Sequence, residues 1–265
     1  MAGLKNTTIS GGYPSLVRIN DNTGVGSSAV QCTDGEGNKV PMKMGKNLLQ
    51  VQPADSDGNA LEVNTSAGTN RFRVNTSTPF VTALGNHVNT QYAYFGVTSQ
   101  ATTANTAGYH YPLQFNCASI GLSDASADQL NIFGNSADPA TSVTTADAAD
   151  QRASILVPYM MYVPDDISID AVYSIEGADA ATGDTTRFHL MSYTFNSGST
   201  SCLTSGTLVA HSDDTTNAGS EQVYKSTWNI DNASVAGGKV LICTFESDSV
   251  NSDFSYQAII KYHLV

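Results

Sequence analysis

Residues 49–75 read LQVQPADSDGNALEVNTSAGTNRFRVN, and this stretch decides the fold. The segments 49–52, 61–64 and 72–75 each place two apolar residues two positions apart, with polar residues between and after them. A period of two is typical of a β-strand that has one dry face. The segments between them are rich in Asp, Asn, Ser, Thr and Gly, which predicts turns.

The apolar pairs recur at intervals of 12 and 11 residues, and each segment offers only two apolar side chains. A single ribbon of this kind cannot bury enough apolar area to offset the entropy of ordering it. Three copies around an axis could, because each dry face would pack on the other two. The repeat therefore predicts a trimeric β stem, with a β-meander at the edge of one domain as the alternative. The predicted core residues of the stem are Leu49, Val51, Leu61, Val63, Phe72 and Val74.

The rest of the sequence divides at the ends of this repeat. Residues 1–45 are turn-rich and poor in apolar residues, which predicts an attachment segment that a partner has to order. Residues 46–84 form the predicted stem. Residues 85–265 hold about eight strand-like segments separated by Gly, Asp, Asn and Ser, which predicts a jelly-roll-like β-sandwich. The expected fold class is therefore all-β, with a short repetitive stem followed by a C-terminal knob.

Composition and charge exclude several function classes. Charged residues make up 14% of the chain, against about 25% in a typical globular protein. The net charge is −12 and the 12 Lys and Arg residues are spread thinly, so nucleic-acid binding is not expected. No apolar run approaches the length of a membrane span, and residues 1–10 lack the apolar core of a secretion signal. We therefore expect a protein that is made in a cytoplasm and does not insert into a membrane.

The four cysteines, Cys32, Cys117, Cys202 and Cys243, lie far apart and form no Cys-x-x-Cys pair, so the spacing of a zinc finger is missing. Small, half-buried thiols in a reducing cytoplasm are the favoured interpretation. Pairing into two disulfides stays open at this point.

The sequence carries none of the common catalytic motifs. It has no Gly-x-Ser-x-Gly elbow, no His-Glu-x-x-His pair and no phosphate loop. Residues 55–59, DSDGN, begin like a calcium loop but lack its late bidentate glutamate, so a turn is predicted there. The five histidines are isolated from one another and are expected to be satisfied or exposed. We predict no catalytic residue, no metal ligand and no cofactor site, and we do not expect an enzyme.

Tyrosine is the more informative residue type, with 12 in the chain. Aromatic rings stack on sugar faces, and Tyr is favoured at interfaces because one end is apolar and the other is polar. We expect core packing or trimer contacts for most of these rings and receptor contact for few. The tyrosines considered are Tyr92, Tyr94, Tyr109, Tyr111, Tyr159 and Tyr162.

Three stretches of the chain resemble structural proteins of marine, cyanophage-like bacteriophages: GKNLLQVQPADSDGNALEVNTS at 45–66, the Thr-, Asn- and Ala-rich stretch that follows the predicted stem, and VNSDFSYQAIIKYHLV at 250–265. The resemblance implies a virion location and a homotrimer. The expected protein is a fibre or appendage that contacts other virion proteins through its N-terminal region. Its knob would be exposed, with a host-surface glycan as a candidate partner. A capsid decoration or cement protein and a carbohydrate-binding module are the alternatives.

Overall fold

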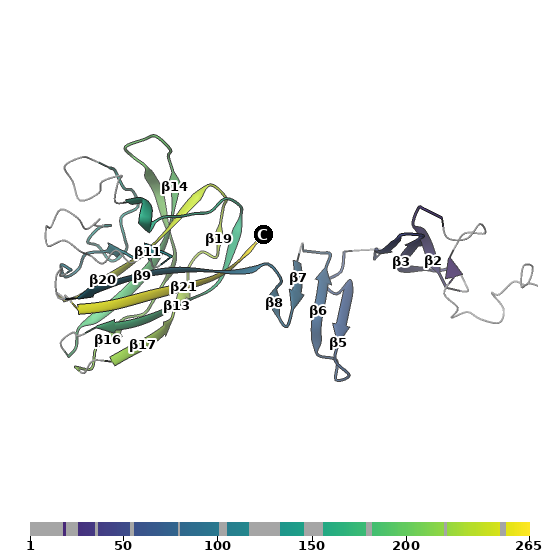
Figure 1. Ribbon diagram of the computed structural model, residues 1–265, viewed down its shortest axis with the longest axis horizontal. Coiled ribbons are helices and arrows are strands. Elements are labelled where there is room, and N and C mark those ends of the chain that lie inside the picture. Colours follow the sequence, from purple (N-terminus) through teal and green to yellow (C-terminus); the bar gives the residue numbers. More distant parts are fainter. Residues whose placement is uncertain are drawn as a thin grey trace, which may run out of the picture. The chain divides into compact units, whose positions relative to one another are not determined.

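The computed structural model describes residues 18–19, 26–34, 37–53, 56–78, 80–100, 105–116, 133–145, 156–178, 182–219, 222–249 and 253–265. The chain divides into two compact units, Met1–Val88 and Asn89–Val265 (Figure 1). Every strand pairing among the described residues is antiparallel, which confirms the predicted all-β class. No described helix is long and apolar enough to cross a membrane.

The first unit contains two separate four-stranded sheets, each with its strands in sequence order. The first sheet is formed by β1 (Arg18–Ile19), β2 (Val30–Thr33), β3 (Lys39–Gly45) and β4 (Leu48–Val51). The second is formed by β5 (Leu61–Asn64), β6 (Asn70–Asn75), β7 (Phe80–Ala83) and β8 (Asn86–His87). Each sheet is a simple meander of consecutive strands, and the β3–β4 and β7–β8 connections are two-residue turns.

Turn residues of the second sheet explain its hairpins. Gly68, between β5 and β6, adopts φ +79°, and its N–H donates to the carbonyl oxygen of Thr65 at 2.9 Å. Leu84 and Gly85, between β7 and β8, have φ of +52° and +80°. Two consecutive positive φ values match the right-handed twist of the strands that a two-residue loop joins. Glycine suits Gly68 and Gly85 because other residues rarely adopt this backbone conformation, and Leu84 is an exception.

The repeat seen in the sequence is split between these two sheets. The segment 49–52 belongs to the β3–β4 hairpin, whereas 61–64 and 72–75 pair with each other as β5 and β6. The connection from β4 to β5 contains Pro53, which has no N–H for a strand ladder. The later part of this connection is tied to the end of β6, because the N–H of Thr76 donates to the carbonyl oxygen of Asp57 at 2.9 Å.

The second unit is built from two larger sheets. One has the order β10-β20-β14-β15-β18, with β12 on β20 and β16 on β14; the other has the order β11-β9-β21-β13-β17, with β19 on β13. The strands are β9 (Thr90–Gln100), β10 (Tyr111–Pro112), β11 (Gln114–Phe115), β12 (Met161–Tyr162), β13 (Ile167–Ala178), β14 (Thr185–Phe195), β15 (Leu203–His211), β16 (Thr215–Thr216), β17 (Gln222–Thr227), β18 (Asn229–Ile230), β19 (Ser234–Val235), β20 (Lys239–Ser247) and β21 (Asp253–Leu264). A short 3-10 helix, Val157–Tyr159, precedes β12.

Aromatic side chains join the two large sheets face to face. Tyr256 of β21 lies across from Phe188 of β14 and Phe245 of β20, with ring centroids 5.3 and 4.9 Å apart. Trp228 stacks on Phe188 at 5.7 Å. Both phenylalanines are fully buried. Each such ring buries a large apolar area, and truncation of a core Phe to Ala typically costs about 3–5 kcal/mol of stability. The second unit is therefore a β-sandwich with one aromatic-rich core.

The two outer faces of this sandwich differ. On the seven-stranded sheet, Met191 and Tyr193 point away from the aromatic core and are covered by Phe133, Val143 and Leu156. On the six-stranded sheet, Tyr92, Tyr94 and Ile175 are 54%, 42% and 40% exposed. One sheet thus has a second apolar layer within the described residues, and the other presents aromatic and aliphatic side chains to its surroundings.

The expected boundaries can be placed on this structure. The expected division between residues 45 and 46 falls at the β3–β4 turn, because Gly45 pairs with Leu48. The expected division between residues 84 and 85 lies in the β7–β8 turn, four residues before the boundary between Val88 and Asn89. Residues 1–45 include β1, β2 and β3, which are paired into one sheet with β4.

Candidate functional sites

The sheet β5–β8 has one apolar face. Leu61 lies opposite Val74 and Val63 lies opposite Phe72 in the antiparallel register, and Phe72 in turn lies opposite Ala83 on β7. Directly opposed residues share a face of the sheet. Leu61 and Val63 are 42% and 55% exposed, so their side chains are only partly covered within the chain.

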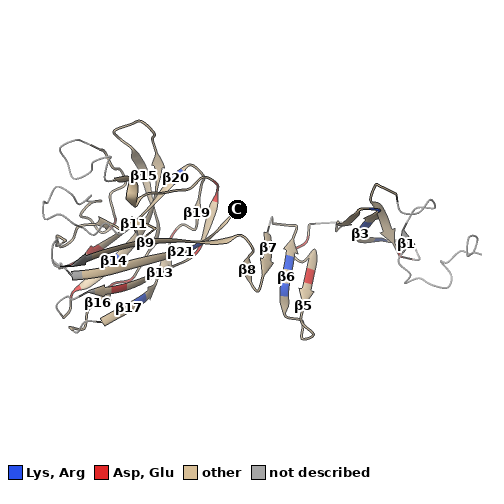
Figure 2. Cartoon of the chain, viewed as in Figure 1, with Lys and Arg blue, Asp and Glu red and all other residues tan. Residues whose placement is uncertain are grey.

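The other face of the same sheet is mainly polar, although it also carries Phe80, whose ring is in edge contact with His87. Glu62 lies opposite Arg73, and Arg73 lies opposite Thr82. Figure 2 shows these two opposite charges on neighbouring strands β5 and β6. Strands that are apolar on one side and charged on the other are built to cover something with the apolar side and to meet water with the other. Four of the six predicted stem residues, Leu61, Val63, Phe72 and Val74, lie together on the apolar side.

The sheet β1–β4 also gathers apolar residues on one face, although Leu48, which is 51% exposed, lies on the opposite face. Leu49 lies opposite Met44 and Val51 lies opposite Met42, and Val30 lies opposite Met44 on its other side. Leu49, Val51 and Met44 are 62%, 41% and 37% exposed. The remaining two predicted stem residues therefore also lie on an exposed apolar face, but on a different sheet from the other four.

The tyrosines singled out from the sequence separate into two groups. Tyr111 and Tyr159 are buried, and Tyr109 packs against the core of the sandwich. The exposed members are Tyr92, Tyr94 and Tyr162, with exposed fractions of 54%, 42% and 56%.

Two of the exposed tyrosines lie on the outer face of the six-stranded sheet. Tyr94 on β9 lies opposite Ile259 on β21, which lies opposite Tyr173 on β13. The ammonium of Lys225 lies 5.3 Å from the centre of the Tyr173 ring. Tyr94 is exposed and Ile259 and Tyr173 are half-buried, so this row forms part of an apolar outer face of the sheet.

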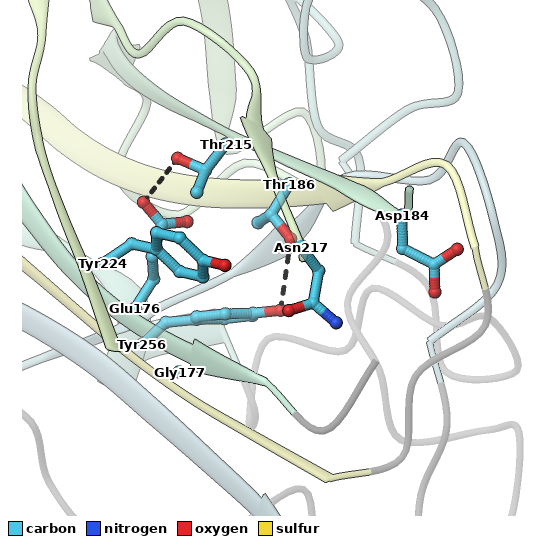
Figure 3. A pocket seen from close by; sticks show the side chains of 8 residues that line it. All are labelled: Glu176, Gly177, Asp184, Thr186, Thr215, Asn217, Tyr224 and Tyr256. Carbon is cyan, nitrogen blue, oxygen red and sulfur yellow. Dashed lines mark hydrogen bonds between the residues drawn. The ribbon is translucent and has the colours of Figure 1, made fainter. Parts of the chain in front are cut away.

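A pocket lies at one edge of the sandwich, around the carboxyl group of Glu176 on β13 (Figure 3). It encloses about 290 Å³ of space, including the part that is open to solvent. Its walls come from β13, β14, β16, β17, β21 and the turn after β16. The lining residues are Glu176, Gly177, Asp184, Thr186, Thr215, Asn217, Tyr224 and Tyr256.

Hydroxyl groups hold one oxygen of the Glu176 carboxyl. Its Oε1 accepts hydrogen bonds from Thr215 Oγ1 at 2.7 Å and from Ser226 Oγ at 3.1 Å. Glu176 is 3% exposed, and this burial raises the pKa of its carboxyl group above the ordinary value, with the two hydroxyl donors acting in the opposite direction. Burial also raises the pKa of the neighbouring Tyr256 to about 12, so that phenol stays protonated at neutral pH.

Sequence reasoning missed this pocket because the strand pattern points the wrong way. In Val172–Glu176 the most apolar side chains after Val172 are Tyr173 and Ile175, which favours placing those two inside. The structure instead buries Ser174 and Glu176 and leaves Ile175 on the outside. Glu176 lies two positions after Ser174 and four after Val172, so the three side chains share one face of the strand. The alternation alone does not show which face of the strand is buried.

Histidines in the second unit have local partners. Nδ1 of His211 lies 2.8 Å from Oδ2 of Asp231, and Nδ1 of His263 lies 2.9 Å from Oδ1 of Asp170. His110 and His189 are both buried with ring centroids 4.9 Å apart. Burial, followed by the nearby His110, lowers the pKa of His189 to about 3, so this ring is neutral at physiological pH.

Three of the four cysteines, Cys32, Cys202 and Cys243, are buried free thiols. Cys117 lies outside the described residues. Burial raises the pKa of the Cys243 thiol well above its ordinary value, which disfavours the reactive thiolate. Among these three, the interpretation as buried thiols is confirmed, and a network of two disulfides is therefore wrong.

The chain matches no protein-family model, and no curated protein is significantly similar to it. The function therefore has to be inferred from the apolar sheet faces of the first unit and from the sandwich and pocket of the second.

Proposed function

We propose that this chain is a structural protein of a bacteriophage particle and forms a homotrimeric fibre or appendage. The observation that carries the proposal is the group of exposed apolar residues on one face of each sheet in the first unit. Four residues on these faces, Leu49, Val51, Leu61 and Val63, are 41–62% exposed in the single chain. Large apolar side chains gathered on one face lose hydration when a second surface covers them, at roughly 25 cal/mol per Å² of buried area.

In this proposal, two further copies of the same chain cover these apolar faces. Each sheet is small, and a two-layer core needs a second apolar surface of matching size. Another copy of the same chain supplies that surface without any further component, and closed symmetry around an axis is the usual way in which copies of a chain assemble. The stem of the proposal is thus a set of short sheets that pack on their equivalents, with Leu49, Val51, Leu61, Val63, Phe72 and Val74 at the axis.

The second unit is proposed to be a jelly-roll knob. Its main strands in sequence order are β9, β10, β13, β14, β15, β17, β20 and β21. Of these eight strands, the first pairs with the last (β9 with β21) and the second with the seventh (β10 with β20). The third pairs with the sixth (β13 with β17) and the fourth with the fifth (β14 with β15). Such nested pairing is what a long hairpin produces when it wraps into two sheets, which supports the jelly-roll assignment.

In this proposal residues 1–45 attach the trimer to other virion proteins, and the knob faces outward, where a host-surface glycan is a candidate partner. The chain performs no catalysis. The outer face around Tyr92 and Tyr94 supports an interaction role for the knob, since both rings are about half exposed on a regular strand.

Labelling of purified particles tests the virion part of the proposal. An antibody against the knob, detected by electron microscopy, should decorate projections on the particle in a few dozen copies or fewer. Hundreds of copies spread evenly over the shell would instead assign the chain as a decoration protein that cements the capsid. No labelling of intact or opened particles, with the protein absent from their denatured components, would refute a virion role.

A further inference from the structure

Residues 133–145 form a cover over part of the outer face of the seven-stranded sheet. Phe133 and Val143 of this cover are buried in one apolar cluster with Met191 and Tyr193. The ring centroids of Phe133 and Tyr193 lie 6.5 Å apart. The cover thus shields an apolar surface that would meet water if these residues moved away.

Two histidine rings from outside the cover bind its backbone. Nε2 of His110, just before β10, lies 2.6 Å from the carbonyl oxygen of Ser136. The ring of His189 on β14 is hydrogen-bonded to the backbone of Ala137. Both rings are buried, and their centroids are 4.9 Å apart. The two histidines therefore fasten two consecutive residues of the cover to the sheet.

The hydrogen bonds of both rings suit the neutral form of histidine. A carbonyl oxygen only accepts hydrogen bonds, so Nε2 of His110 carries the hydrogen that Ser136 accepts. Nδ1 of His110 and Nδ1 of His189 are both buried and have no hydrogen-bond partner among the described residues. A proton on either Nδ1 would therefore add a buried positive charge and a new N–H without an acceptor.

Positive groups gather around His189. Burial is the main cause that lowers the pKa of His189 to about 3, and His110, Arg187 and His211 act in the same direction. The hydrogen bond to the backbone of Ala137 acts against them. His189 therefore stays uncharged in mildly acidic solution as long as the cover is closed.

Carboxylates on the neighbouring elements compensate little of this cost. Oε2 of Glu246 on β20 lies 4.0 Å from Nε2 of His110, beyond hydrogen-bond distance. Asp214 is paired with Arg187 at 2.7 Å, and Asp138 of the cover is exposed. None of these carboxylates receives a hydrogen bond from Nδ1 of either buried histidine.

We propose that the cover is an acid-sensitive switch: protonation of His110 and His189 releases residues 133–145 from the sheet and exposes the apolar surface beneath them. Two cations with ring centroids 4.9 Å apart repel each other, and each regains hydration when the cover leaves. The aromatic core of the sandwich lies on the other face of the seven-stranded sheet and stays packed. Return to neutral pH removes the charges and closes the cover again.

The direction and range of the pH effect follow from His189. Its pKa in the closed form is about 3, against an ordinary value of 6.5. The stability of the closed form is therefore complete above pH 6.5 and is lost progressively as the pH falls from 6.5 towards 3. One proton bound only in the open form raises the open population about tenfold for each pH unit in this range.

Hydrogen exchange of the full-length protein between pH 7 and pH 4 tests this inference. The amides of Phe133 and Ala140 donate to the carbonyl oxygens of His110 and Phe133. After correction for the chemical exchange rate at each pH, their protection should fall about tenfold per pH unit below pH 6.5. The paired amides of β13 and β21 should keep their protection. A dye that fluoresces on apolar surfaces should brighten over the same range and dim again at pH 7.

Matched variants assign the effect to the two buried rings. The double variant His110→Gln, His189→Gln keeps an amide N–H at each position but takes up no proton, so it should remove most of the pH dependence of the cover. His263→Gln makes the same change on β21, where Nδ1 lies 2.9 Å from Oδ1 of Asp170, and should keep the dependence of the unmodified protein. Melting temperatures at pH 7 verify that the variants fold.

Three results would overturn the inference. The first is constant protection of the cover from pH 7 to pH 4. The second is a loss of protection in β13 and β21 at the same pH as in the cover, which would mean that the whole sandwich unfolds. The third is a folded double variant whose cover still responds to pH like the unmodified protein. The first two are measured on the unmodified protein, so they decide the inference even where the double variant does not fold.

Discussion

Replacement of Val63 by Asp is the sharpest perturbation of the proposed stem. Val63 is 55% exposed in the single chain, so about half of its apolar surface is left for a partner to cover. Full burial of a valine contributes about 1.5–3 kcal/mol, and an unpaired buried charge costs about 3–5 kcal/mol, so the change removes about 4–6 kcal/mol per chain from the assembly. A dissociation constant of 1 μM corresponds to about 8 kcal/mol, so a loss in all three chains should abolish the trimer.

Sedimentation velocity at micromolar concentration should therefore find Val63→Asp as a folded monomer. The matched control is Asn64→Asp, which places the same charge one residue later on the polar face of β5. Because its side chain would stay in water, this variant should sediment like the unmodified protein. A Val63→Asp protein that assembles normally, with an unchanged melting temperature, would show that position 63 does not face the axis.

Three further predictions concern the second unit and the thiols. Glu176→Gln should raise the melting temperature at pH 8 and leave it nearly unchanged at pH 4. Burial raises the pKa of Glu176 in the folded protein, so the stability contributed by its protonated form is complete below the unfolded-state pKa and is lost as the pH rises through the folded-state pKa. An equal gain at both pH values would refute a buried carboxyl group that holds its proton. Gly206→Ala should lower the unfolding free energy by about 1–3 kcal/mol, because a Cβ there would lie 2.6 Å from the ring of Tyr193, and an unchanged chemical denaturation midpoint would contradict that contact. The thiols of Cys32, Cys202 and Cys243 should react with a thiol reagent only after denaturation, and rapid labelling of any of them in the native protein would mean that it is not buried as described.

Alternation of apolar and polar residues predicted three strands of the first unit, β4, β5 and β6, whereas β2, β3, β7 and β8 were not predicted. Leu61 and Val63 alternate with the charged Glu62 and the amide Asn64, so the sequence allows only one face of this strand to be apolar. The register of β5 and β6 agrees with that face. The division of the repeat into two sheets was not predictable in the same way, because Leu49–Gln52 and Leu61–Asn64 have the same pattern. Which strands pair depends on the turn between them, and the Pro-containing connection from β4 to β5 is read correctly only once its contact with Thr76 is known.

The pocket lay beyond sequence reasoning for a different physical reason. In β13 both faces carry apolar side chains, with Val172 inside and Tyr173 and Ile175 outside, so periodicity does not define the buried side. Glu176 is placed inside by tertiary packing against β16 and β17, whose hydroxyls arrive from residues 39 and 50 positions later in the chain. Long-range hydroxyl partners of this kind leave no trace in a local pattern.

The mass of the full-length protein in solution tests the central claim most directly. Native mass spectrometry over a range of micromolar concentrations should give a single assembly of about 84 kDa, three times the chain mass of 27.9 kDa. The trimer should persist on dilution and should not depend on a reducing agent, because the described cysteines are free. A stable species of 27.9 kDa across the whole range, in protein whose melting transition shows that it is folded, would contradict the trimer and with it the proposed stem.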